Sequence, residues 1–108
     1  AHGLACGLTL PHFLVYNHSV SKDDCLDQRG VKFVKRRIKE IAGFLGAKDV
    51  KAGKKVILDL MKSIGLPSRI DFDMEVVVKD AFSPERVANN PRRVTETGLR
   101  EILDKISI

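Results

Sequence analysis

Apolar residues recur at intervals of three and four along residues 31–45, and this spacing constrains the fold more than any other feature of the sequence. The apolar positions are Val31, Val34, Ile38, Ile41, Ala42 and Leu45. They share one face of a helix, whereas a half-buried strand would need strict alternation. We therefore predict an amphipathic helix that Gly46 ends, with either a break near Gly30 or an earlier start capped by Ser21.

Two further helices are predicted where an acidic residue precedes an apolar run. Asp49 can cap a helix over residues 50–64, and Asp73 can cap a short helix over residues 74–82. The apolar face of the first is Val56, Ile57, Leu60, Met61 and Ile64. The three valines at 76–78 would suit a buried strand equally well by periodicity. The sequence offers no strand to pair with them, so we favour the helix.

The last helix is predicted to begin after Thr95, beyond a short turn that starts at Ser83. Val94, before the cap, can pack on Leu99 as a hydrophobic staple. The buried stripe of this helix is Leu99, Ile102, Leu103 and Ile106. Every predicted element is helical, and no hairpin signal separates two alternating runs. We therefore predict an all-α fold, a helical bundle that forms a single domain over residues 1–108.

The opening segment, residues 2–17, is apolar on nearly every side. Such a helix is buried over most of its surface, either at the centre of the bundle or under another domain. Gly3, Ala5 and Gly7 would let other backbone approach closely near its start. The chain begins at Ala1 without an initiator Met, so we expect it to be a piece of a longer protein.

The cysteine count and the lengths of the apolar runs exclude several classes of protein. Cys6 and Cys25 cannot make the disulfide framework of a small secreted domain, and no CxxC spacing suggests structural zinc. No apolar run approaches the ~20 residues of a membrane span, and the sequence contains no charged segment followed by an apolar run of the signal-peptide kind. We expect a cytoplasmic, reduced protein without a membrane partner.

The histidines are the first candidates for chemistry, and they are His2, His12 and His18. A neutral imidazole at His2 could bind a metal ion, although by spacing alone a frayed terminal residue is the better interpretation. We expect His12 to be a hydrogen-bonded core residue and His18 to be exposed. Cys6 is interpreted as a small buried filler. Gly53-Lys54-Lys55 lacks the first glycine and the Ser or Thr of a phosphate-binding loop, so we expect the chain to bind no nucleotide independently.

A run of cations on the predicted helix over 31–45 is the second candidate. Its members are Lys32, Lys35, Arg36, Arg37 and Lys39. Clustered cations bind nucleic acid, but Glu40 interrupts this run and no RNA-binding aromatic motif accompanies it. We interpret the run as a solvated face and do not expect nucleic acid as a partner. Phe33 and Phe44 lie away from the main stripe and suggest contact with a missing domain or with a second subunit of a homo-oligomer.

Three motifs resemble one enzyme family. Ala1-His2-Gly3-Leu4-Ala5-Cys6, continuing through Leu10-Pro11-His12-Phe13 to Asn17, resembles the segment P-H-G-x-A-N-A-x-x-L-P-H-x-x-x-x-N of the iron-containing (group III) alcohol dehydrogenases. Ile64-Gly65-Leu66-Pro67 resembles the I-G-[IL]-P turn of that family, and Asn90-Pro91-Arg92 with Thr95 resembles its N-P-R-x-x-T motif. The order and spacing agree along the whole chain. The departures are Ala1, where Pro is common, and Cys6-Gly7, where Asn-Ala is common.

The resemblance implies a two-domain enzyme with the dehydroquinate synthase-like fold, of which this chain is the C-terminal helical domain. A missing N-terminal α/β domain would bind NAD(P), and Fe²⁺ or Zn²⁺ would sit in the cleft between the domains. His2 would be one metal ligand; the other ligands, an aspartate and two histidines, would lie upstream. The implied reaction transfers a hydride between a small alcohol or aldehyde and the nicotinamide.

The same resemblance implies that the isolated chain is inactive, because one histidine cannot complete a metal site. Two alternatives stay open at this point. One is a stand-alone basic helical module that binds an acidic partner or nucleic acid. The other keeps the dehydroquinate synthase-like superfamily but replaces alcohol oxidation with another polyol or lyase-type reaction.

Overall fold

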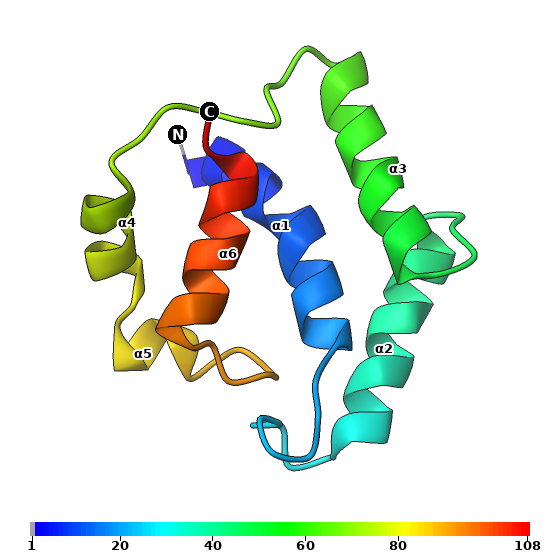
Figure 1. Cartoon of the computed structure of the whole chain (residues 1–108). Coiled ribbons are helices and arrows are strands. Elements are labelled where there is room, and N and C mark those ends of the chain that lie inside the picture. Colours follow the sequence, from blue (N-terminus) through cyan, green and yellow to red (C-terminus); the bar gives the residue numbers. More distant parts are fainter. Residues whose placement is uncertain (1) are drawn as a thin grey trace.

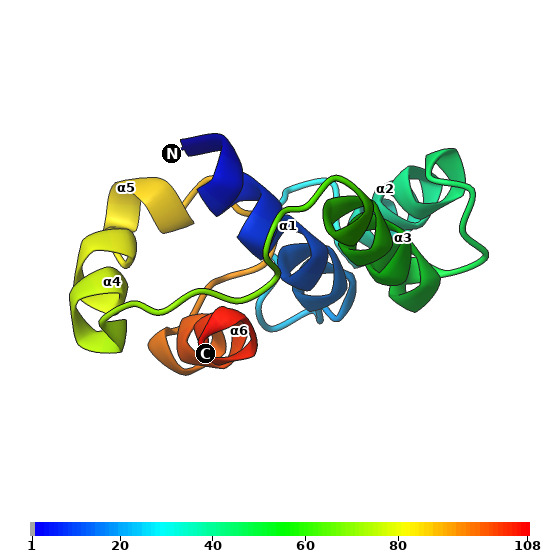
Figure 2. The same cartoon turned by 90° about the horizontal axis from the view of Figure 1, so that it is seen from above.

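The predicted all-α class is confirmed by a computed structural model that describes residues 2–108, with the side chains of His2, Gly3, Pro84 and Arg86 outside the described part. Within it the chain forms six helices: α1 (His2–His18), α2 (Val31–Phe44), α3 (Val50–Ser63), α4 (Met74–Ala81), α5 (Pro84–Val87) and α6 (Glu96–Ile106). Helix α1 packs against α2, α3 and α6, and α4 packs on α6. Figures 1 and 2 show α1 at the centre, between the α2–α3 pair and the α4–α5–α6 side.

The helix ends follow the capping signals of the sequence. The carboxylate of Asp49 accepts the backbone N–H of Ala52 at 2.7 Å, and the hydroxyl of Thr95 accepts that of Gly98 at 3.0 Å. Asp73 caps α4 in the same way, which confirms the helix over the strand. Each cap satisfies a backbone donor that has no partner inside its helix.

Glycines with positive φ delimit α2. Gly30 has φ 95° and precedes the helix, and Gly46 has φ 80° and follows it. Ala47 N–H donates to Ala42 O at 3.0 Å, and Gly46 N–H donates to Gly43 O at 2.9 Å, which closes the helix in a Schellman motif. The expected earlier start at Ser21 is wrong, because the Gly30 backbone cannot continue a helix.

The hydrophobic core consists of two clusters, and α1 contributes to both. Leu8 belongs to the cluster that lies against α3, α4 and α6, and Leu14 belongs to the one that lies against α2 and α3. The predicted stripe of α6 is confirmed, since all four of its apolar residues are buried. None of the helices in residues 2–108 combines the length and apolar character that a membrane span requires.

The predicted face of α3 is only partly correct. Met61 is buried, but Leu60 is 59% exposed and Ile64 is 63% exposed. A close crossing covers the start of this face: a Cβ on Gly53 would lie 3.1 Å from Ala42 Cβ on α2 and 3.5 Å from Leu14 Cδ2 on α1. Leu60 follows Gly53 by seven residues and so lies on the same side of α3, two turns further along, where it is exposed.

Helix α1 is largely covered, as its composition predicts, but one of its faces is exposed. Leu10 is 53% exposed, and Cys6, one turn earlier, is also exposed. The interpretation of Cys6 as a buried filler is therefore wrong. The two residues are four positions apart and so lie on one face of α1, which no element of residues 2–108 covers.

We predict opposite effects of alanine at two helical glycines. A Cβ at Gly98 would lie 2.9 Å from Tyr16 Cε2, and this ring is held because its hydroxyl donates to Arg93 O at 2.6 Å. Gly98→Ala should lower the free energy of unfolding by about 1–3 kcal/mol, as overpacking does. Gly43 has no atom within 4 Å of a built Cβ, so Gly43→Ala should raise this free energy by about 0.5–1 kcal/mol.

Urea denaturation followed by far-UV circular dichroism measures both variants against the parent chain. A Gly98→Ala chain that is as stable as Gly43→Ala would contradict the close packing of Tyr16 on α6.

Candidate functional site

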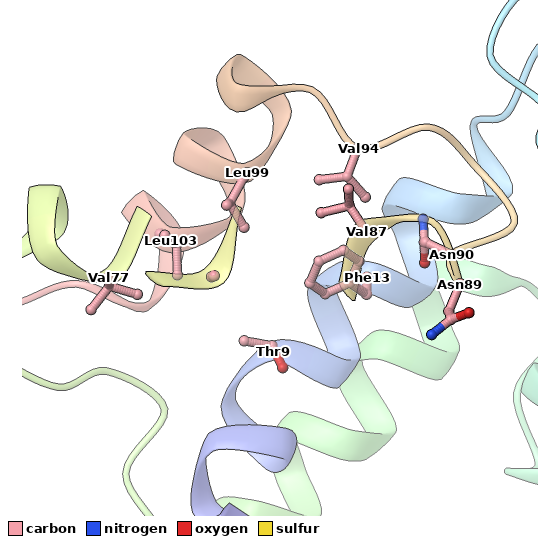
Figure 3. Close-up of a pocket in the computed structure, with 10 residues that line it drawn as sticks. Thr9, Phe13, Val77, Val87, Asn89, Asn90, Val94, Leu99 and Leu103 are labelled. Atoms are coloured by element: carbon pink, nitrogen blue, oxygen red, sulfur yellow. The ribbon is translucent and has the colours of Figure 1, made fainter. Parts of the chain in front are cut away.

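An apolar pocket of about 440 Å³ lies between α1, α4, α6 and the segment that connects α4 to α6. Its helical walls are Thr9 and Phe13 from α1, Val77 and Ala81 from α4, and Leu99 and Leu103 from α6. The connecting segment adds Val87, Asn89, Asn90 and Val94, and Figure 3 shows the two asparagines on one side of the group. Such an apolar hollow with a few polar groups at one end is typical of a small-molecule site.

The α1 wall of this pocket is held by contacts within the helix. Thr9 Oγ1 donates to Ala5 O at 3.0 Å, so its hydroxyl proton is engaged by the backbone and the methyl group is left as the apolar part. The Phe13 ring meets the Tyr16 ring edge to face, with 6.0 Å between centroids. Neither residue offers an acid or a base, and we assign this wall to shape rather than proton transfer.

The asparagine side of the pocket is tied to the end of α1. Asn17 Nδ2 donates to Asn90 Oδ1 at 3.0 Å, and Asn90 Nδ2 donates to Asn17 Oδ1 at 2.7 Å. Asn90 Nδ2 also reaches Arg92 O at 2.6 Å. The amide of Asn90 is therefore used in holding the segment, which leaves Asn89, exposed at the rim, to face a ligand.

Arg92 completes this attachment. Its Nε donates to Asp24 Oδ2 at 2.7 Å and its Nη1 donates to Tyr16 O at 2.8 Å, while the guanidinium stacks 4.1 Å from the Tyr16 ring centre. The backbone N–H of Ser21, followed by Arg92, lowers the pKa of Asp24. We call Tyr16, Asn17, Asp24, Asn90 and Arg92 the α1–α6 clamp. The two asparagines of this clamp are 73 residues apart in the sequence.

His2, the predicted metal ligand, stands at the start of α1, but its side chain lies outside the described residues. Its backbone position can still be placed. Thr9 follows it by seven residues and Phe13 by eleven, which are close to two and three whole turns. Position 2 therefore shares a side of α1 with the wall of the apolar pocket, roughly 10 Å further along the helix axis.

The described residues do not form a metal site of their own. No group of three or more His, Cys, Asp or Glu side chains in that part of the chain could hold a metal ion. A stable site in a protein needs about three or more such ligands. An imidazole at position 2 is a suitable ligand for a metal ion, but one ligand alone cannot hold the ion.

His12 is buried as predicted, with 8% of its surface exposed. The expected hydrogen bonding is not seen at Nδ1, which has no partner among the described residues. Burial, followed by the positive charges of Lys54, Lys105 and Arg69, lowers the pKa of His12 to about 4. The imidazole is therefore neutral at pH 7.

The cationic run is a solvated face, as predicted, with Lys32, Arg36, Arg37 and Lys39 exposed, whereas His18 is placed differently from the expectation. His18 is half-buried rather than exposed, and its carbonyl accepts Lys35 Nζ at 2.7 Å. Arg37 pairs with Glu40 at 3.1 Å, and the guanidinium of Arg29 lies 4.1 Å from the centre of the Phe33 ring. Part of this cationic face is thus engaged within the chain, while Phe44, at 89% exposure, is left open.

The charge state of His12 predicts how stability depends on pH. Its pKa is about 6.5 in the unfolded chain and about 4 in the folded one. The unfolded chain therefore binds the proton first, so the contribution of His12 is complete above about pH 6.5 and is lost as the pH falls toward 4. Between pH 7.5 and pH 5 this should lower the free energy of unfolding by about 1–2 kcal/mol.

Urea titrations at the two pH values test this, with His12→Gln as the variant that cannot titrate and His18→Gln as the matched control. His12→Gln should remove most of the loss, and His18→Gln should remove little of it. An unchanged pH dependence in His12→Gln would refute the assignment.

Comparisons with known proteins cover nearly the whole sequence. Residues 1–107 match the family described as "Fe-containing alcohol dehydrogenase family, C-terminal". The chain is 35% identical, over 109 aligned positions, to a phosphonoacetaldehyde reductase of Streptomyces viridochromogenes. This alignment covers 99% of the chain but 27% of that relative, so the chain spans about a quarter of its length. No solved structure gives a significant match.

Proposed function

The chain belongs to the iron-containing alcohol dehydrogenase family, and from this premise we propose that it is the helical part of a metal-dependent, NAD(P)-linked alcohol or aldehyde oxidoreductase. The nucleotide-binding domain would be supplied by residues outside the chain, since the relative is about four times as long. The name of that relative describes an aldehyde reductase, which favours an aldehyde as substrate. We place the parent enzyme in the cytoplasm.

The observation that carries the proposal is the position of the apolar pocket. It lies against the side of α1 that also carries position 2, so an organic substrate in the pocket would lie about two to three turns along this helix from its start. We assign His2 as one ligand of an iron or zinc ion whose other ligands come from the preceding domain.

The residues of this chain would contribute binding and exclusion of water. The aliphatic and aromatic walls would bind the carbon chain of the substrate. They would also exclude water from the carbon atom that exchanges the hydride. Asn89 at the rim offers an amide to a polar end of the substrate. The α1–α6 clamp would keep these walls in one arrangement, so that the substrate is oriented before reaction.

The parent protein with its upstream residues is the object of the test. Purified with its metal, it should reduce a small aldehyde with NAD(P)H, whereas the 108-residue chain alone should show no turnover. His2→Ala in the parent should remove most of the bound metal and lower kcat/KM by at least about a hundredfold, because a residue that binds the metal directly is lost. Metal analysis and the absorbance of the nicotinamide at 340 nm measure the two quantities.

His18→Ala is the matched control, because His18 lies at the other end of α1. It should leave both the metal content and the turnover close to those of the parent. The proposal fails if His2→Ala keeps its metal and activity, or if the 108-residue chain turns over an aldehyde by itself.

A further inference from the structure

A second pocket, of about 270 Å³, lies against α1 and shares no lining residue with the apolar one. It is lined by His12 of α1, Lys54 and Leu58 of α3, Ser68 and Arg69 of the segment before α4, and Lys105 of α6. Four parts of the chain thus converge on one hollow. Its lining is more polar than apolar, and it contains three cationic side chains and no carboxylate.

The positive charges of this pocket are not neutralised within the chain. Neighbouring cations on the same helices do have acidic partners: Lys55 pairs with Asp59 at 2.9 Å, and Arg100 pairs with Glu75 at 2.7 Å. Among the described residues no ion pair involves Lys54, Arg69 or Lys105. Arg69 Nη1 donates to Ser107 O at 3.1 Å, which orients the guanidinium without changing its charge.

The buried imidazole of His12 points to the same ligand chemistry. His12 is 92% buried, and its Nδ1 has no hydrogen-bond partner among the described residues. A buried polar atom without a partner costs about 1–3 kcal/mol, so such an atom beside a cationic hollow needs an explanation. An anion in the pocket would bring acceptors to the serine hydroxyl and the three cations together, beside the buried imidazole.

We propose that this pocket is a binding site for a small oxyanion of the phosphate class, either free or as the terminal group of a phosphorylated metabolite. The guanidinium of Arg69 provides a planar fork for two oxygens, and the two ammonium groups balance a double negative charge. Because the pocket is a hollow beside the buried His12 side chain, a small anion fits it better than an acidic protein surface does.

The site is independent of the proposed oxidoreductase function, since it shares no lining residue with the apolar pocket. Occupation has a measurable consequence within the chain. A bound dianion would offset the positive field on His12 and raise the pKa of its imidazole from about 4 toward its ordinary value. By linkage, the occupied chain would keep more of its stability in mild acid.

The test is an NMR titration of the 108-residue chain with inorganic phosphate, followed at the histidine ring carbons. Sodium chloride at equal ionic strength is the reference, and glycerol 3-phosphate is the second ligand. We expect a saturable shift of the His12 signal with phosphate and none with chloride, while the His18 signal moves little. Equal binding of glycerol 3-phosphate would assign the site to the phosphate group of a metabolite; exclusion of it would assign the site to free phosphate.

Charge-matched variants separate the pocket from general attraction. Lys105→Gln and Arg69→Gln should each weaken phosphate binding by at least about tenfold. Lys79→Gln removes the same charge from the exposed surface of α4 and should leave binding unchanged. The proposal is overturned if phosphate gives no saturable shift, if chloride gives the same shift, or if Lys79→Gln weakens binding as much as Lys105→Gln does.

Discussion

The guanidinium of Arg92 joins the end of α1 to the segment before α6, and the arrangement of the helices depends on this contact. It binds a carboxylate, a backbone carbonyl and an aromatic face at once, with its side chain only 22% exposed. A lysine could not make these three contacts together. The amide pair of Asn17 and Asn90 lies beside it and extends the attachment to the rim of the apolar pocket.

Because of this attachment, α1 serves as the common wall of two different sites. Its Thr9 and Phe13 side faces the apolar pocket, and its His12 side faces the cationic one. The two core clusters meet on the same helix through Leu8 and Leu14. The exposed face with Cys6 and Leu10 is then the surface that a preceding domain would be placed to cover, consistent with the proposed two-domain enzyme.

The fold class and most helix ends could be predicted from the sequence because they depend on local chemistry. Asp49, Thr95 and Gly46 act within one turn of their own helices, and all three signals are confirmed. The family membership was predicted from the motifs around His2 and Asn90 and is confirmed by the comparisons. The assignment of His2 to the metal stays a prediction.

What could not be predicted depends on contacts between distant residues. Leu60 is exposed although it lies on the same side of α3 as Gly53, and periodicity alone does not say how far along a helix its apolar face is covered. Asp24 pairs with Arg92, 68 residues later, and no local pattern in the sequence indicates this contact. The cations around His12 lie on α3, on α6 and in the segment before α4, so no spacing pattern brings them together.

A double-mutant cycle on Asn17 and Asn90 tests the clamp most directly, because each amide donates to the other. The free energy of unfolding is measured by urea denaturation for Asn17→Ala, Asn90→Ala and the double variant. We predict a coupling energy of about 1–2 kcal/mol, the size seen for residues in one hydrogen-bond network. Effects that add within about 0.3–0.5 kcal/mol, as for independent sites, would contradict the clamp as the contact that holds the pocket wall to α1.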